Sequence, residues 1–375
     1  MANDVGGFVA PGFEVVRDAF AENFTERGEI GAAFAATKDG DLVVDLWGGW
    51  SDRSGGSPWQ RDTLQLIFSG AKGLVAICVL LLVERGQLDL DEPVSRYWPE
   101  FGKETIRIKD VLAHTARLPG IASPISLRDL LDTRRMALAL ETQEPSSDPR
   151  AELCYHALTF GWLCGELIRR ASGRTIGRFF ADEVAAPLNL ELWIGLPPQE
   201  DDRVAALVLA PSWPVTKHLR SETFQRDELV RSIWGNPPIF DRDVFPWNDS
   251  SFHEAEIPAV GAIGTARSIA TLFGNLDRLL DASTIDVATA VFSEGWDDAH
   301  ESPRRFGAGF ELQTESHPLG PPGDAFGHSG AGGSMQGCWP SERVGFSYAM
   351  NLMRDDERED ARSAVLLRAL HQAVH

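Results

Sequence analysis

The sequence predicts an α+β fold in which both ends of the chain build one antiparallel sheet flanked by helices. Three observations lead to this prediction: a helix and a hairpin signal near the N-terminus, helical patterns with long loops in the middle, and strand signals that return beyond residue 306. We therefore expect an α/β domain of residues 1–75 and 285–375, with a mostly helical domain of residues 76–284 inserted into it.

The N-terminal elements are a helix and two strands. The helix is predicted because four apolar side chains recur at helical spacing: Phe13, Val16, Phe20 and Phe24. Two apolar runs follow, Gly31–Ala36 and Leu42–Trp47, and the pair Asp39-Gly40 lies between them. An Asp-Gly pair between such runs is a strong hairpin signal, because tight hairpin turns need positive φ angles.

A second helix should begin near Ser69 and run to about Arg85, with Gly86 as its C-terminal stop. It is apolar on nearly every side, which predicts a central buried helix. Further helices are expected over residues 127–138, 158–172 and 265–280, and long ordered loops over the Pro- and Trp-rich stretch 197–258. The last strands are expected over residues 306–313, 325–328, 335–339 and 344–352, and a final helix over residues 355–374.

Composition excludes some classes of function. The 375 residues carry a formal net charge of −20, which would repel nucleic acid. The longest apolar stretch, Leu74–Val83, is about half of a membrane span, so no membrane insertion is expected. Four cysteines without a CxxC pair fit a reducing cytoplasm. The oligomeric state does not follow from these numbers.

The strongest chemical signal is Ser69-Gly70-Ala71-Lys72 at the start of the apolar helix. Three residues are nearly one helical turn, so the amine of Lys72 should lie beneath the hydroxyl of Ser69. A serine attacks only when a base takes its proton, and an uncharged lysine can be that base. Burial and the positive end of the helix dipole should both lower the pKa of Lys72. The alternative is a lysine that reaches the surface, with Ser69 as a helix cap.

Two further segments could complete a site. Tyr155, just before the helix at 158–172, could exchange protons if a lysine ammonium lies near it, although a core tyrosine is the plainer interpretation. The run Gly327-His328-Ser329-Gly330-Ala331-Gly332-Gly333 could let a substrate carbonyl approach a strand edge. A backbone N–H there, paired with that of Ser69, would form an oxyanion hole. A glycine-rich turn with a surface histidine remains the alternative.

Together these motifs resemble those of the serine β-lactamase and penicillin-binding-protein superfamily: Ser69-x-x-Lys72, Tyr155, and His328-Ser329-Gly330 in place of Lys-Thr-Gly. The segments around Tyr155 and His328 are similar to those of class-C-β-lactamase-like esterases, the family VIII carboxylesterases. The resemblance implies a β-lactamase-like fold and acylation of Ser69, with Lys72 and Tyr155 sharing proton transfer. It also implies an oxyanion hole from the N–H groups of Ser69 and Ala331, and a substrate pocket lined by His328, Ser329 and Gly330.

Two departures from the class C pattern favour a small neutral ester as substrate. Ala157 stands where those enzymes have an asparagine that contacts the substrate amide, and His328 stands where they have a charged lysine. The loop His114-Thr115-Ala116-Arg117-Leu118 also differs, with no consequence that the sequence reveals. We therefore expect a serine carboxylesterase without a cofactor.

Several alternatives remain at this level. A β-lactamase, a D-Ala-D-Ala peptidase-like amide hydrolase or an acyltransferase would use the same acyl-enzyme on Ser69. An inactive binding module would not be expected to retain Ser69, Lys72 and Tyr155 together. An α/β-hydrolase built on Ser329 is rejected because Ala331 replaces the required glycine and too little chain follows. No metal site is expected, and the segment Asp297–Glu301 is interpreted as a solvated loop.

Overall fold

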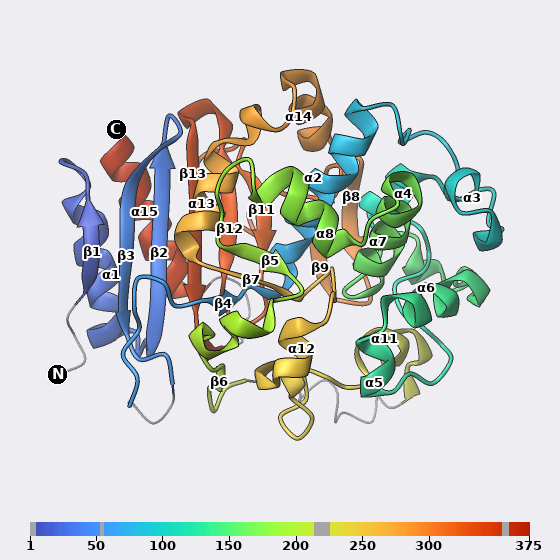
Figure 1. Ribbon diagram of the computed structural model, residues 1–375, viewed down its shortest axis with the longest axis horizontal. Helices are drawn as coiled ribbons and strands as arrows, with labels where there is room; N and C mark the ends of the chain where they lie inside the picture. Colours follow the sequence, from blue (N-terminus) through green and yellow to red (C-terminus); the bar gives the residue numbers. More distant parts are fainter. Residues whose placement is uncertain (1–4, 53–55, 214–225, 355–359) are drawn as a thin grey trace.

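The computed structural model describes residues 5–52, 56–213, 226–354 and 360–375. Its central element is a nine-stranded antiparallel sheet in the order β1-β3-β2-β13-β12-β11-β10-β9-β8 (Figure 1). In that order the strands are Gly6–Val9, Asp41–Gly49, Gly31–Lys38, Val344–Met350, Met335–Trp339, Phe326–Ser329, Glu311–Leu312, Ser302–Phe306 and Ser293–Asp297. Both chain ends therefore contribute to one sheet, and the predicted α+β class is confirmed.

The hairpin between β2 and β3 forms as its turn residues predict. Asp39 and Gly40 have φ angles of 54° and 85°, which lie in the left-handed region that a two-residue hairpin turn requires. The strands pair from Lys38 opposite Asp41 to Gly31 opposite Gly49. This hairpin joins the C-terminal strands through β2, which pairs with β13 along its length.

Helices cover the sheet and fill the middle of the chain. They are α1 (Glu14–Glu26), α2 (Ala71–Glu84), α3 (Val94–Tyr97), α4 (Ile108–Leu112), α5 (Leu127–Leu130), α6 (Thr133–Thr142), α7 (Thr159–Ser172), α8 (Ile176–Phe180), α11 (Glu228–Trp234), α12 (Ser250–Glu254), α13 (Ala266–Gly274), α14 (Ala282–Thr289) and α15 (Ala361–Val374). α1 and α15 pack against each other, while α13 lies over β13, β2 and β12 (Figure 1). The predicted inserted domain, residues 76–284, would include α13, although α13 packs on the sheet of the other domain. The domain boundaries at 75/76 and 284/285 therefore stay a proposal.

Helix α2 is the centre of the apolar core. Every residue from Ala71 to Leu82 is buried, and the helix packs against α7 and α8. A helix that is apolar on all sides can be stable only when other elements surround it, and this one is surrounded. A short 3-10 turn, η1 (Phe68–Gly70), leads into it, so Ser69 lies immediately before the helix.

Two predicted elements are interrupted in the structure. The helix over residues 127–138 is divided into α5 and α6, because Asp132 caps α6 by accepting hydrogen bonds from the N–H groups of Arg134 and Arg135. The strand over residues 306–313 is divided into β9 and β10, because the Ala308 N–H donates to the carbonyl of Ala288 instead of to a sheet neighbour. The first residues of the predicted final helix, 355–359, lie outside the described residues.

The Pro- and Trp-rich stretch 197–258 is described except for residues 214–225. It contributes β6 (Val208–Leu209), which pairs in parallel with β14 (Leu352–Met353). A third small sheet has the order β4 (Gln65–Leu66), β7 (Ala262–Gly264) and β5 (Leu192–Ile194). Within the described ranges, none of the helices has both the length and the hydrophobicity that crossing a bilayer demands.

Candidate active site

Ser69 lies on a turn that the surrounding core holds in a rare conformation. Phe68 has a φ angle of 47°, which residues other than glycine seldom adopt. Its ring is buried against Trp247 and Phe240, at centroid distances of 5.3 Å and 5.7 Å. Part of the Pro- and Trp-rich stretch is therefore an aromatic support beneath the Ser69 turn.

Lys72 is fully buried one turn further along, and its Nζ lies 3.1 Å from the Oγ of Ser69. The same nitrogen donates to the backbone carbonyls of Ala157, at 2.8 Å, and Ala259, at 3.1 Å. Burial lowers the pKa of Lys72 well below its usual value, and the positive charge of Arg304 adds to this, while Glu311 opposes it. The expected pairing of the two side chains is present, and Lys72 does not reach the surface.

Tyr155 comes from the loop before α7 and is also buried. Its ring centre is 4.8 Å from Lys72 Nζ, and its hydroxyl shares a hydrogen bond with Ser69. Burial raises the pKa of Tyr155 above its usual value, and Glu311 raises it further. The sequence suggested that a nearby lysine ammonium would ease loss of the phenol proton. The pKa directions instead favour a neutral amine on Lys72 and a protonated phenol on Tyr155.

The glycine-rich segment begins at the end of β11 and crosses close to the Ser69 turn. A Cβ on Gly330 would come within 2.3 Å of the Ile67 carbonyl oxygen and 2.1 Å of Ser334 Oγ, so a glycine is required for this approach. The segment is held by Glu311, whose carboxylate accepts from the N–H and the hydroxyl of Ser329, both at 2.9 Å.

These residues surround a cavity of about 370 Å³. The predicted site residues that line it are Ser69, Tyr155, Ser329, Gly330 and Ala331, while Lys72 lies beneath Ser69. The remaining lining residues are Trp234, Arg304, Glu311, His317, Pro318, Leu319, Gly332, Gly333, Ser334, Met335, Arg354, Asp360 and Ser363. A space of this size suits a small organic substrate.

His328 differs from its expected position on the cavity wall. Its ring is buried, with Nδ1 donating to the Ser329 carbonyl at 2.7 Å and Nε2 lying 3.5 Å from the Tyr155 hydroxyl. Along β11 successive side chains point to opposite faces of the sheet, so Ser329 can reach the cavity while His328 points into the core. Burial lowers the pKa of His328 to about 4, so the ring is neutral at pH 7.

A charged group beside Tyr155 was not predicted from the sequence. Glu311, on β10, lies 3.4 Å from Arg304, on β9, and 3.6 Å from His328 Nδ1. Burial opposes ionisation of Glu311, but the protonated form of His328, present in acid, and the charge of Arg304 lower its pKa to about 2, so Glu311 is an anion at pH 7. The guanidinium of Arg304 also lies 5.1 Å from the ring centre of Tyr155. An acidic residue inside the apolar stretch Phe310-Glu311-Leu312 was the available signal.

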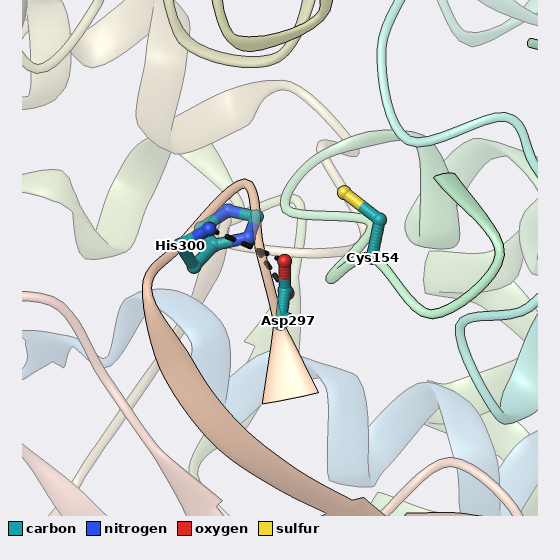
Figure 2. Close-up of side chains that lie close together, drawn as sticks. All are labelled: Cys154, Asp297 and His300. Carbon is teal, nitrogen blue, oxygen red and sulfur yellow. Dashed lines mark hydrogen bonds and ion pairs between the residues drawn. The ribbon is translucent and has the colours of Figure 1, made fainter. Parts of the chain in front are cut away.

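The segment Asp297–Glu301 is only in part the solvated loop that the sequence suggested: Asp298 and Glu301 are exposed, but Asp297 is fully buried. Its Oδ2 accepts from the Tyr155 N–H at 2.8 Å. The same oxygen accepts from His300 Nδ1 at 2.7 Å (Figure 2). Its Oδ1 accepts from the N–H groups of Ala299 and His300. Burial opposes ionisation, but these hydrogen bonds and the charge of His300 hold the pKa of Asp297 below its usual value. The segment therefore anchors the backbone of Tyr155.

Cys154 completes a group of three possible metal ligands with Asp297 and His300, whose ligand atoms all lie within 4.8 Å of one another (Figure 2). Hydrogen bonds already use the ligand atoms of Asp297 and His300, since Asp297 has the donors above, His300 Nδ1 donates to Asp297, and His300 Nε2 accepts from Trp234 Nε1 at 3.2 Å. Burial raises the pKa of the Cys154 thiol, which disfavours the thiolate that a metal would need. The donor set fits a hydrogen-bonded cluster better than a metal centre.

The loop His114–Leu118 supports the segment that contains Tyr155 and His156. His114 Nδ1 accepts from the His156 N–H at 3.0 Å, and the His156 ring in turn accepts from the Leu118 N–H at 3.2 Å. The rings of His114 and Tyr155 are 4.8 Å apart. This loop therefore supports the Tyr155 segment together with Asp297 and His300, and no short-range pattern in the sequence indicated this role.

Comparison with known proteins shows the family. The sequence model described as Beta-lactamase matches residues 16–370. The chain is 31% identical to Esterase/beta-lactamase LipL of Mycobacterium tuberculosis (strain ATCC 25618 / H37Rv) over 369 residues, which cover 92% of this chain and 82% of LipL.

Two solved structures are similar over 99% of this chain and all of theirs. One is the crystal structure of a family VIII carboxylesterase, with a TM-score of 0.89 and 33% identity. The other is a penicillin-binding protein homologue from Caulobacter crescentus, with a TM-score of 0.88 and 32% identity. The chain belongs to the β-lactamase family, and its structural neighbours there include family VIII carboxylesterases and penicillin-binding-protein homologues.

Proposed function

We propose that this protein is a serine carboxylesterase that hydrolyses small neutral carboxylic esters through an acyl-enzyme on Ser69. The enzyme class is supported by relatives that are named esterases and by the family VIII carboxylesterase neighbour. The observation that carries the mechanism is the set of three contacts around Lys72 Nζ: Ser69 Oγ and two backbone carbonyls.

A neutral amine has two hydrogens and one lone pair. The carbonyls of Ala157 and Ala259 take both hydrogens, so the lone pair faces Ser69 Oγ, 3.1 Å away. Lys72 can then accept the proton of Ser69 as Oγ attacks the ester carbonyl. The lowered pKa of Lys72 agrees with this protonation state.

Tyr155 then acts as the donor to the leaving group. The ester C–O bond breaks, and the leaving oxygen takes the Tyr155 proton while Lys72 returns its proton to the phenol oxygen. Hydrolysis of the acyl-enzyme is the reverse, with water in place of the alcohol. The N–H groups of Ser69 and Ala331 are proposed to stabilise the oxyanion, since both residues line the cavity.

A neutral substrate is supported by the residues that replace charged or amide groups of the class C pattern. Ala157 offers only its backbone carbonyl, which is bound to Lys72. His328 is neutral at pH 7 and buried, so it offers no permanent charge to a substrate carboxylate. The four cysteines are all buried free thiols, which supports a reducing compartment such as the cytoplasm as the location.

Intact-mass spectrometry after incubation with a short-chain p-nitrophenyl ester and an acid quench tests the proposal. We expect one acyl adduct on the peptide that contains Ser69, and neither adduct nor turnover in Ser69→Ala. Ser329→Ala is the matched control and should still be acylated, although Ser329 also lines the cavity. An adduct on Ser329, or turnover that survives Ser69→Ala, would contradict the mechanism. Faster hydrolysis of a chromogenic cephalosporin than of the ester would favour the β-lactamase alternative.

A further inference from the structure

Two buried hydrogen-bond donors on the wall of the active-site cavity have no partner in the described part of the chain. They are Nε of Arg304, on β9, and Nδ1 of His317, in the segment after β10. Both side chains line the cavity that also contains Ser69 and Tyr155. Buried donors are almost always paired, because leaving one unpaired costs the free energy of its lost hydration.

The contact between the two side chains determines which ring nitrogen of His317 carries the proton. Its Nε2 lies 3.4 Å from Nη1 of Arg304. A guanidinium can only donate, so Nε2 must be the acceptor and the ring proton is on Nδ1. Burial lowers the pKa of His317, and the Arg304 charge adds to this, so the ring is neutral at pH 7. His317 Nδ1 is therefore an N–H donor without a partner.

Arg304 also has a hydrogen-bond donor, Nε, that the described residues do not pair. Its side chain is only 14% exposed, and its contact with Glu311 is a single one, at 3.4 Å through Nη1. The other carboxylate oxygen of Glu311 is occupied by the N–H and hydroxyl of Ser329. A fully paired structural arginine would make short, two-armed contacts with its carboxylate. Arg304 thus keeps donor capacity within the cavity.

We propose that Arg304 and His317 form a substrate subsite for a second oxygen acceptor on the ester, such as a keto, alkoxy or hydroxyl oxygen. The inference rests on the proposed esterase function and narrows its substrate class. A neutral acceptor fits better than a carboxylate, because the charges that line the cavity balance: Arg304 and Arg354 against Glu311 and Asp360. Arg304 Nε and His317 Nδ1 are shielded from solvent in the structure, so the two side chains turn toward the cavity when such an oxygen takes the hydrogen bonds that the protein leaves unmade.

The test compares two substrates of nearly the same shape, p-nitrophenyl pentanoate and p-nitrophenyl 4-oxopentanoate. We expect wild type to prefer the oxo ester by about tenfold or more in kcat/KM, because a site with unpaired donors discriminates against an analogue that lacks the acceptor. In Arg304→Met and in His317→Phe the ratio should fall toward about one. The ratio is the readout because it cancels effects of either change on Ser69 chemistry, and His317→Phe suffices if Arg304→Met does not fold.

Arg305→Met is the matched control. Arg305 neighbours Arg304 on the same strand, and its Nε also has no hydrogen-bond partner among the residues that the structure describes, with Glu294 3.7 Å away, but Arg305 is not among the cavity-lining residues. Its variant should keep the wild-type preference. Equal rates for both esters in wild type, or a preference that persists in both Arg304→Met and His317→Phe, would overturn the subsite. A stronger preference for the monoanionic p-nitrophenyl hydrogen glutarate would overturn its neutral character. Failure to acylate Ser69 with any ester would instead refute the esterase proposal.

Discussion

The two walls of the active-site cavity differ in how the sequence encodes them. Ser69 and Lys72 are three residues apart, and their contact follows from one turn of helix. The facing wall is assembled from separate strands, with Arg304 on β9, Glu311 on β10 and Ser329 on β11. The first wall supplies the nucleophile and its base, and the second sets the charge around them. Local spacing thus encodes the reacting groups, and sheet register encodes their electrostatic environment.

The largest effect should come from the base on the first wall. Lys72→Met removes the lone pair that faces Ser69, and kcat/KM should fall by about 10³-fold. Lys72→Arg tests whether Lys72 acts as a base or only as a positive charge. The variant keeps the charge but removes the base, because an arginine cannot lose its proton in a protein. It should be as inactive as Lys72→Met in a steady-state assay with a p-nitrophenyl ester.

A matched control exists elsewhere in the fold. Lys103 Nζ likewise makes three contacts, here with the backbone carbonyls of Phe101, Leu140 and Glu141, but it lies outside the cavity lining. Lys103→Met should lose thermal stability and keep near-wild-type kcat/KM. Substantial activity in a folded Lys72→Arg variant would show that the residue acts by charge, and the proton-transfer scheme would have to be abandoned.

The same contrast explains which features could be predicted. The hairpin, α2 and the Ser69–Lys72 pair depend on turn residues and helical spacing, and the structure has all three. The short edge strands β1 and β8 were missed, because they are only four and five residues long and their burial does not alternate in the way that marks a strand. The burial of Asp297 was missed for a related reason. Its partner, the Tyr155 N–H, is 142 residues away, and only the folded sheet brings them together.

An intermediate effect is expected from the second wall. The anionic carboxylate of Glu311 raises the pKa of Lys72, so Glu311→Gln should lower that pKa further. Since Lys72 acts as the neutral amine, the acidic limb of the kcat/KM profile should move to lower pH, by about one unit. Absolute activity should fall about tenfold, because Gln offers one acceptor oxygen to the two Ser329 donors.

The pH profile distinguishes this electrostatic role from a purely structural one. A loop that merely loosened around Ser329 would reduce kcat/KM equally at every pH and leave the acidic limb in place. A limb that moved to higher pH would contradict this electrostatic role of Glu311, because removing a nearby anion cannot raise the pKa of Lys72.

The smallest effect on activity should come from Asp297, which contacts Tyr155 through the Tyr155 backbone N–H and not through its phenol. Asp297→Asn keeps one acceptor oxygen but turns an amide toward N–H donors, so we expect a loss of roughly 1–3 kcal/mol in stability. The decrease in kcat should be only severalfold. Asp298→Asn, at the exposed neighbouring position, is the control and should change neither quantity.

The stability difference should itself depend on pH, and the sign follows from the pKa direction. The pKa of Asp297 in the folded protein is below its usual value of 3.8, so its ionised form stabilises the fold above that pH. This contribution is lost as pH falls through the folded-state pKa. Thermal unfolding at pH 7 and near pH 3 should therefore show a gap between wild type and Asp297→Asn that narrows in acid. A gap that stays constant would mean that Asp297 acts through packing alone, and the buried carboxylate would then contribute no charge to holding Tyr155 in place.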